Sequence, residues 1–291
     1  MKSALMYYYN LENPTIYKTN GKIYVKDTKN RYILEVVHSI KELNEIYYLI
    51  SKIKPENYNE IVINKFNELF FEHNTIKYVL IKTNNDSTYR ENNIIKKEPI
   101  VNNNYQLDRS NWYFLWCKKN DYFEYQNNHI AKEYKLIDES SDYYIGMAET
   151  AISYIKYNIQ QTDNNLTICH KRIKNDEMSN PMNLVVDHRE RDISEYLKYI
   201  FINQENNLNT INRILNNYNY TKDEYIRIYA RMLYPSYYFD AYDEIINKKE
   251  SEKKLKTIID RIEEYEMYLW QIHVQISKKI QIKKVDWINE K

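Results

Sequence analysis

Ile168-Cys169-His170-Lys171-Arg172 opens the stretch that decides the fold, which continues through Asn183-Leu-Val-Val-Asp187-His188 to Arg191-Asp192-Ile-Ser-Glu195. The first run predicts a short apolar strand that leads into His170. An Asn then opens a second apolar strand, which ends in Asp187. A further acid, Asp192, stands where a helix begins. The pattern predicts two short strands joined by a polar and basic loop, with a helix to follow.

The first 84 residues predict a small lobe of five strands and one helix. Residues 14–19 and 22–26 flank Asn20-Gly21, a pair typical of a type I′ hairpin turn. Residues 31–37 continue as a third strand. Ser39 then caps a helix whose apolar positions recur at helical spacing. The last two strands are predicted over residues 60–65 and 77–82.

Residues 85–108 are polar and rich in Asn, and they predict a linker or loop. Helical patterning dominates residues 109–291, which we predict to be a helical lobe. We expect its helices at about residues 109–136, 142–159, 192–202, 206–217, 222–233 and 251–280. The last of these carries a continuous apolar stripe, from Leu255 to Ile280. Such a stripe serves as a dimer seam, which would make a homo-oligomer, or more commonly packs onto its own domain.

Composition excludes several classes of function. There are 42 basic and 41 acidic residues, so no basic field exists to attract nucleic acid or an anionic membrane. No run of about 18 apolar residues occurs, which argues against insertion into a membrane, and the first ten residues are too polar beyond Tyr9 for a signal peptide. With only 2 Gly, the chain cannot form a Walker A or G-x-G-x-x-G phosphate loop. We expect Cys117 and Cys169 to be reduced, in an intracellular protein.

The order of elements, together with Ile-Cys-His170, Val-Val-Asp187-His and Arg191-Asp192-Ile-Ser-Glu195-Tyr, resembles the spore-coat-associated kinase-like proteins of endospore-forming bacteria, the CotS/YutH group. These proteins belong to the wider aminoglycoside phosphotransferase-like fold. The stretches Tyr143-Tyr-Ile-Gly146-Met-Ala-Glu149 and Val285-Asp286-Trp287 also resemble that group. The resemblance implies an α+β, two-lobed protein-kinase-like fold, with a small sheet-plus-helix lobe and a large helical lobe.

The resemblance assigns roles to five residues of the deciding stretch. His170 matches the catalytic-loop His, and Arg172 stands where the family carries its catalytic Asp. Asn183 would match the metal-binding Asn, although it lies thirteen positions after His170, further than the family pattern places it. Asp187 matches the Asp that chelates Mg²⁺. Asp192 would be the structural Asp at a helix start.

The amino-terminal lobe departs further from the family. Glu35 occupies the position of the Lys that pairs with the phosphates of ATP. Glu45 matches the helix acid that would orient that Lys, and here it has no cation to orient. No Gly-rich loop surrounds Gly21. A positioned catalytic base contributes roughly 10²–10⁴ in rate, so the changes at positions 35 and 172 together favour a pseudokinase.

Each of these residues also has a structural interpretation. His170 would be a core histidine bonded to a carbonyl, and Asp187 a turn or capping residue. Asp192 would cap a helix, because Glu195 follows at capping-box spacing. Lys171 and Arg172 would belong to a solvated charge run rather than an anion site. A zinc site is improbable without a further Cys or a well-spaced second His.

The chain holds 32 Tyr, and its aromatic clusters permit two interpretations. Trp112, Trp116, Tyr122-Phe123 with Tyr125, and Tyr237-Tyr238 would form adhesive surfaces, since such residues are enriched at interfaces. Alternatively they fill the core of a chain poor in Gly and Ala. We favour the core for Trp112 and Trp116 and leave both interpretations open for Tyr237-Tyr238.

The resemblance implies a spore coat or sporulation-associated pseudokinase that acts through protein contacts. We therefore expect no cofactor, other spore coat proteins as partners, and a location in the mother-cell cytoplasm followed by the spore coat. The alternative is an active, atypical phosphotransferase of the aminoglycoside phosphotransferase type that uses ATP and Mg²⁺. A third possibility, a helical protein unrelated to kinases, requires that the first 84 residues form no sheet.

Overall fold

A computed structural model of the chain describes residues 1–19, 21–52, 58–83, 105–159, 165–174, 177–204, 208–216, 219–248 and 251–288. Its internal contacts divide it into two units. Unit 1 comprises Met1–Asp108 and Leu166–Asp187, and unit 2 comprises Arg109–Asn165 and His188–Lys291. Residues 166–187, which we placed in the helical lobe from the sequence, therefore make their contacts with the amino-terminal residues.

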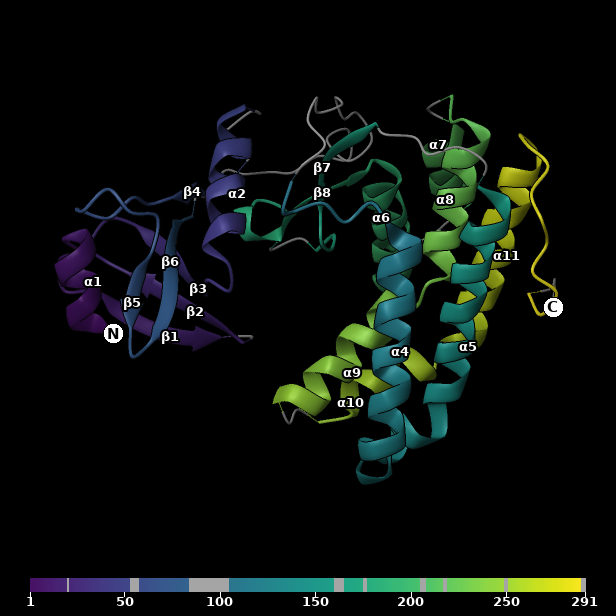
Figure 1. The fold of residues 1–291 in the computed structure, drawn as a ribbon, viewed down its shortest axis with the longest axis horizontal. Coiled ribbons are helices and arrows are strands. Elements are labelled where there is room, and N and C mark those ends of the chain that lie inside the picture. Colours follow the sequence, from purple (N-terminus) through teal and green to yellow (C-terminus); the bar gives the residue numbers. More distant parts are fainter. Residues whose placement is uncertain are drawn as a thin grey trace. The chain divides into compact units, whose positions relative to one another are not determined.

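Unit 1 is built on an antiparallel sheet in the order β1-β2-β3-β6-β4, with β5 paired to β6 (Figure 1). The strands are β1 (Thr15–Thr19), β2 (Lys22–Lys26), β3 (Arg31–Val36), β4 (Glu60–Ile61), β5 (Phe71–His73) and β6 (Ile76–Lys82). Thr19 pairs with Lys22, which confirms the predicted hairpin. Gly21 has a φ of 77°, as a tight turn requires, and Asn20 lies outside the described residues.

Both faces of the sheet are buried, because successive side chains of a strand point to opposite sides. Leu34 packs with Leu80 and with Leu5 of α1 (Lys2–Tyr9) on one face. Ile33 packs on the other face with Ile81 and with α2 (Ile40–Lys52). Ser39 Oγ accepts a hydrogen bond from Glu42 N at 3.2 Å, which confirms the predicted cap of α2.

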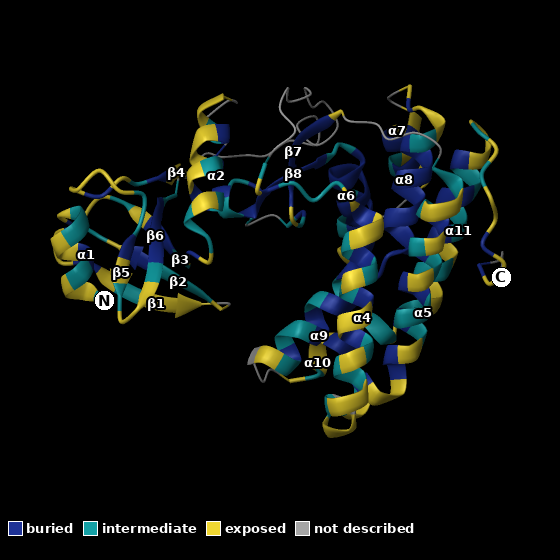
Figure 2. Cartoon of the chain, in the orientation of Figure 1, coloured by how far each residue is buried: buried dark blue, intermediate teal, exposed yellow. Residues whose placement is uncertain are grey.

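Two strands, β7 (Leu166–His170) and β8 (Leu184–His188), form a separate two-stranded sheet. Every residue of β7 is buried, and only His188 of β8 is not (Figure 2). Leu166 and Ile168 of β7, and Leu184 and Val186 of β8, share one hydrophobic cluster with Ile33. The second strand pair therefore covers the same face of the large sheet as α2.

Unit 2 is helical. Its helices are α4 (Trp112–Ile130), α5 (Lys135–Asn158), α6 (Glu190–Ile202), α7 (Leu208–Asn216), α8 (Lys222–Leu233), α9 (Ser236–Lys248), α10 (Lys253–Ile259) and α11 (Ile262–Ser277), with 3₁₀ turns at Ala131–Glu133 and, in unit 1, Pro181–Asn183. Helix α5 packs against α4 and α8, and α8 also packs against α6 and α11 (Figure 1). Within the described residues, no helix is both long and apolar enough to cross a bilayer.

The core of unit 2 is aromatic. Trp112 and Trp116 are 3% and 5% exposed, so the core interpretation of both is confirmed. Tyr238 is buried and stacks on Tyr144 with ring centroids 3.7 Å apart, whereas Tyr237 is half-buried. Tyr125 is 60% exposed. Aromatic side chains thus fill much of the interior, and a smaller number lies on the surface.

Several predicted boundaries are wrong. The structure has α1, β5 and α9, which the sequence did not lead us to expect, and the strand predicted over residues 60–65 is only Glu60–Ile61. The helix predicted at 251–280 is broken into α10 and α11 at Asp260 and Arg261. Its apolar stripe nonetheless packs on the core of its own unit.

Candidate functional site

The loop between β7 and β8 is closed by Asn183. Its side-chain amide donates to Arg172 O at 2.8 Å and to Glu177 O at 3.1 Å. Its Oδ1 accepts from Arg172 N at 3.2 Å, and its backbone O accepts from Lys171 N at 2.7 Å. Asn183 therefore uses its amide group to hold the loop backbone, which is a structural role. Its predicted role at a metal remains a prediction.

His170 ends β7 and is fully buried. Its ring stacks on Tyr58, with centroids 6.3 Å apart and an angle of 19° between the ring planes. Its burial agrees with a core histidine, and the predicted bond to a carbonyl stays a prediction. Arg172, two positions on, is half-buried, and its Nη1 donates to Lys171 O at 2.7 Å. The guanidinium is thus part of the loop's own hydrogen bonding.

Glu35 lies on β3 opposite Val79 of β6. It follows Ile33 by two residues, so its side chain points to the face covered by β7 and β8. Its Oε1 accepts a hydrogen bond from Asn180 Nδ2 at 2.5 Å. Asn180 belongs to the loop between β7 and β8, so this bond joins β3 directly to the loop in which we predicted the catalytic residues.

The surroundings of Glu35 raise the pKa of its carboxyl above the ordinary value. The largest cause is burial, and the negative charge of Glu177 adds to it. The hydrogen bond from Asn180 and the positive charges of Lys22 and Lys171 act in the opposite direction. Lys22 Nζ forms a salt bridge with Glu177 Oε1 at 3.1 Å. The two acidic side chains of this cluster, Glu35 and Glu177, thus interact with two basic ones, Lys22 and Lys171.

The carboxylate of Glu45 accepts hydrogen bonds from two backbone N–H groups. Its Oε1 accepts from Gln106 N at 3.1 Å, and its Oε2 accepts from Leu107 N at 2.8 Å. Leu107 O in turn accepts from Val186 N at 3.0 Å. The helix acid of the family pattern thus fixes the segment before α4 next to β8. Its predicted role at a cofactor remains a prediction.

Asp187 is the fourth residue of β8, directly before His188, and it is fully buried. Its backbone O accepts a weak hydrogen bond from Cys169 Sγ at 3.9 Å. The role that we predicted for Asp187 as a Mg²⁺ ligand remains a prediction. In the described part of the chain, no group of three or more His, Cys, Asp or Glu side chains is arranged to hold a metal ion. A Mg²⁺ ion held by Asp187 and phosphate oxygens would not need such a group.

Asp192 belongs to unit 2 and lies within the first turn of α6. The helix begins at Glu190, with Arg189 at its N-cap position and no side-chain cap. The prediction that Asp192 caps the helix is therefore wrong, because the helix starts two residues earlier than the sequence suggested. Its position still places a buried carboxylate at the positive end of the helix dipole.

Two buried ion pairs follow on α6, and sequence reasoning missed both. Arg227 Nε lies 2.9 Å from Glu190 Oε1, and Arg231 Nη2 lies 3.0 Å from Glu195 Oε1. Burial raises the pKa of Glu190 to about 7, although the charge of Arg227 opposes the shift. The acids lie five residues apart on α6 and the arginines four residues apart on α8. This spacing was the only sequence signal, and it is common on solvated faces.

The model of the family described as "Spore coat putative kinase YutH" matches residues 2–272. The chain belongs to this family. Among curated relatives, the endospore coat-associated protein YutH of Bacillus subtilis (strain 168) is 26% identical over 314 aligned residues, which cover 90% of this chain and 91% of the relative. The prediction made from the deciding stretch, that the chain resembles the CotS/YutH group, is confirmed.

Solved structures with the same fold are small-molecule phosphotransferases. Spectinomycin phosphotransferase, in complex with ADP and spectinomycin, is 12% identical with a TM-score of 0.58, and the match covers 94% of this chain and 97% of that one. An aminoglycoside phosphotransferase from Alicyclobacillus acidocaldarius is 9% identical with a TM-score of 0.54, over 91% and 92% of the two chains. The predicted α+β, kinase-like fold class is therefore confirmed, and a kinase-unrelated helical protein is excluded.

Proposed function

We propose that this protein is a pseudokinase of the spore coat, which acts through contacts with other coat proteins and not through phosphoryl transfer. Membership of the spore coat family supports the coat as its setting. The hydrogen bond between Glu35 and Asn180 is the observation that carries the non-catalytic assignment. The function is that of a structural component whose kinase-like fold is retained as a scaffold.

The argument begins with what ATP requires. In protein kinases a Lys on the third strand pairs with phosphates, and Mg²⁺ is held by an Asp and by an Asn of the catalytic loop. Here the strand position carries Glu35, which adds a negative charge and accepts from Asn180. The Asn position carries Asn183, whose Oδ1 accepts from Arg172 N. Of the three ligand-holding positions, only Asp187 keeps the chemistry that Mg²⁺ needs.

Packing supports the same conclusion. Ile33, which lies on the same face of β3 as Glu35, shares a hydrophobic cluster with Leu184 and Val186 of β8. A nucleotide inserted into this cluster would expose apolar surface, at about 25 cal/mol per Å². It would also have to break the bond from Asn180 to a partly buried carboxylate. The residues present do not fit ATP and Mg²⁺.

The proposal extends to location and partners. We expect synthesis in the mother-cell cytoplasm and assembly onto the coat. The name of the Bacillus subtilis relative, an endospore coat-associated protein, supports the coat as the destination. Exposed aromatic side chains, among them Phe114 and Tyr157 at 60% and 74% exposure, offer contact area for coat proteins. The alternative is an active phosphotransferase in which Asp187 holds Mg²⁺ and a base other than residue 172 accepts the proton.

Nucleotide binding distinguishes the two functions. We expect no change in the thermal unfolding midpoint of the purified protein with ATP and Mg²⁺ up to 5 mM (about the cellular range), with an active aminoglycoside phosphotransferase as the positive control. A ligand at about 100 times its Kd adds roughly 2.7 kcal/mol, which is a rise of several degrees. A rise of that size that disappears in Asp187→Ala would overturn the proposal.

A second experiment tests the proposed setting directly. A fluorescent fusion carrying Asp187→Ala should reach the spore coat as the unchanged protein does, because the proposed function does not use a metal. Circular dichroism of the purified variant would show that it is folded. A folded Asp187→Ala variant that fails to assemble would show that Asp187 has a functional role and would favour the enzyme.

A further inference from the structure

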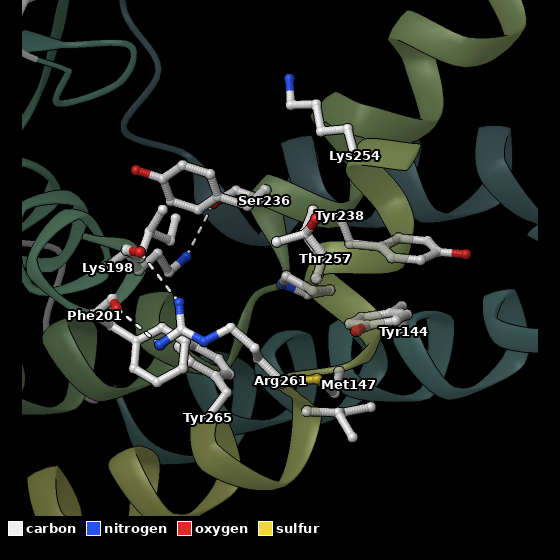
Figure 3. Close-up of a pocket in the computed structure, with 15 residues that line it drawn as sticks. Tyr144, Met147, Lys198, Phe201, Ser236, Tyr238, Lys254, Thr257, Arg261 and Tyr265 are labelled. Carbon is white, nitrogen blue, oxygen red and sulfur yellow. Dashed lines mark hydrogen bonds between the residues drawn. The ribbon is translucent and has the colours of Figure 1, made fainter. Parts of the chain in front are cut away.

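Unit 2 contains a cavity of about 270 Å³ that lies apart from the kinase-like residues of unit 1 (Figure 3). Its walls come from the first half of α5, the carboxyl-terminal half of α6, the first turn of α9, and α10 with the start of α11. All of these elements belong to unit 2, so the cavity is complete within one unit.

Five of the fifteen described residues that line the cavity are aromatic. Tyr144 and Tyr238 stack on one another, and Phe201 and Tyr265 contribute two more rings. The hydroxyl groups of two of these tyrosines are already bonded to protein: Tyr265 donates to Met232 O at 2.7 Å, and Tyr238 lies 2.9 Å from Ser140 Oγ. These side chains therefore present ring carbon to the cavity, which suits an apolar ring or a short chain.

The charged groups of the wall have one sign. Among the fifteen described residues that line the cavity, three are basic (Lys198, Lys254 and Arg261) and none is acidic. Lys198 is 2% exposed, and its Nζ donates to Tyr234 O at 2.7 Å and to Ser236 Oγ at 3.0 Å. Ser236 is the first residue of α9, so the ammonium lies beside the positive end of a helix dipole.

The second inward charge is fixed in place. Arg261 donates through Nη1 to Ile202 O and through Nη2 to Phe201 O, both at 3.1 Å, and its guanidinium lies 4.3 Å from the centre of the Phe201 ring. Lys254 pairs with Glu244, and Figure 3 shows its amine pointing away from the labelled rings. Arg261 Nε pairs with Glu264 Oε2 at 2.9 Å, so part of its charge is balanced. A negative group placed among the rings would therefore be attracted chiefly by Lys198 and less by Arg261.

From this cavity and its charges we propose that unit 2 binds a small amphiphilic acid, a molecule with one apolar ring or short chain and one carboxylate. The apolar body lies among the rings of α5, α9 and α11. The carboxylate lies towards Lys198 and Arg261. This site is independent of the proposed loss of nucleotide binding, because it uses neither Glu35 nor Asp187.

Three indole compounds of nearly equal size test the assignment with the full-length protein. Indole-3-acetate carries a negative charge, tryptophol is neutral and tryptamine is positive. Isothermal titration should give indole-3-acetate a Kd at least tenfold lower than that of tryptophol, with tryptamine weaker still. No binding by indole-3-acetate up to millimolar concentration, or equal binding by the acid and the amine, would overturn the proposal.

Two variants locate the site. Thr257→Trp adds a ring at the exposed edge of the cavity and should abolish binding, whereas Lys256→Trp, at an exposed position of α10 outside the lining, should leave it unchanged. Lys198→Met should remove the preference for the acid over tryptophol, provided that its circular dichroism shows a folded protein. Binding of indole-3-acetate that persists unchanged in Thr257→Trp would place the ligand elsewhere and refute the assignment.

Discussion

At the scale of single residues, Glu35 places an acidic side chain on a largely apolar face of a regular strand. It stands in regular register on β3, and its carboxylate is bonded to a loop that is distant in sequence. Since burial is the largest cause of its raised pKa, the charged form costs free energy in the folded state. Unfolding relieves that cost, so the stability of the protein depends on the protonation of this group.

Glu35→Gln tests that dependence. The folded pKa lies above the ordinary 4.5, so the carboxyl group's favourable contribution is complete below that pH and is lost as pH rises through the folded pKa. Gln keeps an acceptor for Asn180 and carries no charge. We therefore expect Glu35→Gln to have the unfolding midpoint of the unchanged protein at pH 4 and a higher one at pH 7 to 8.

Glu60→Gln is the matched control, because Glu60 is an exposed acid on β4 of the same sheet. Its midpoint should follow that of the unchanged protein across the whole pH range. A Glu35→Gln curve that also runs parallel to the unchanged protein would show that Glu35 is not destabilised by its charge.

The buried pair of Arg231 and Glu195 gives a second residue-scale prediction. Arg231→Met leaves the carboxylate of Glu195 buried without this guanidinium, and removal of one partner of a buried pair costs about 3–5 kcal/mol. Lys135→Met is the control, because its ion pair with Glu139 is solvent-exposed and worth less than about 1 kcal/mol. Urea titration followed by circular dichroism measures both, and equal losses would contradict the prediction.

The sequence allowed the positions of Glu35 and Asp187 to be predicted, because each is tied to a strand with a clear apolar pattern. It did not reveal Asn180, since the bond to Glu35 joins residues 145 positions apart. A single sequence carries local periodicity and not long-range pairing. The one available signal was the thirteen-residue spacing from His170 to Asn183, which left room for a loop with contacts of its own.

At the scale of elements, the bounds of α8, Lys222–Leu233, were predicted correctly from the sequence. Its start carries a complete capping box. Glu224 N donates to Thr221 Oγ1 at 3.3 Å, and Thr221 N donates to Glu224 Oε2 at 2.7 Å. A local signal of this kind is readable because it lies within four consecutive residues.

Thr221→Ala should therefore lower the free energy of unfolding by about 1 kcal/mol, since the cap acceptor is lost. Thr257→Ala within α10 should have no such effect or a small gain, because Ala has the higher helix propensity. Chemical denaturation of the two variants side by side makes the comparison. A loss in Thr257→Ala as large as that in Thr221→Ala would mean that capping is not the cause.

The break between α10 and α11 shows what the apolar stripe could not reveal. The stripe runs on across Asp260 and Arg261 with helical spacing, and for this reason the sequence predicted one helix. The guanidinium of Arg261 instead binds carbonyl groups at the end of α6, which is 59 or 60 positions earlier in the chain. The turn is therefore stabilised by a tertiary contact that no local pattern encodes.

At the scale of the whole molecule, each unit has its own hydrophobic core. Leu184 lies in the core of unit 1 and Leu197 in that of unit 2, and both are fully buried. All four Trp residues (112, 116, 270 and 287) belong to unit 2. Tryptophan fluorescence therefore reports on unit 2 alone, whereas hydrogen exchange in β3 and β6 reports on unit 1.

Replacement of either leucine by Ala should cost about 2–5 kcal/mol. In Leu184→Ala we expect exchange protection of β3 and β6 to be lost at a lower urea concentration, with little change in the fluorescence transition. Leu197→Ala should shift the fluorescence transition instead. If both probes move together in both variants, the two units unfold as one cooperative system, contrary to the prediction.

The sequence predicted a strand-rich amino-terminal part and helices after it, and the structure agrees at that level. It did not predict that residues 166–187 would join the amino-terminal part, because chain order alone placed them among helices. Their membership in unit 1 follows from Ile168 and Val186, which pack against the sheet. The apolar pattern of a strand predicts that it is buried, and only the tertiary structure shows against which element.

The bond between Asn180 and Glu35 also bears on how easily this protein could acquire phosphoryl transfer by substitution. Lys at position 35 would set an ammonium against the amide protons of Asn180, so two donors would face each other inside the unit. Lys at position 35 therefore requires a second substitution at Asn180, and neither substitution is useful without the other. The loop between β7 and β8 would also have to become shorter. Under the proposed function, a variant with only one of these substitutions would be less stable than the present protein. Single substitutions therefore select against a gain of catalysis and favour the present role.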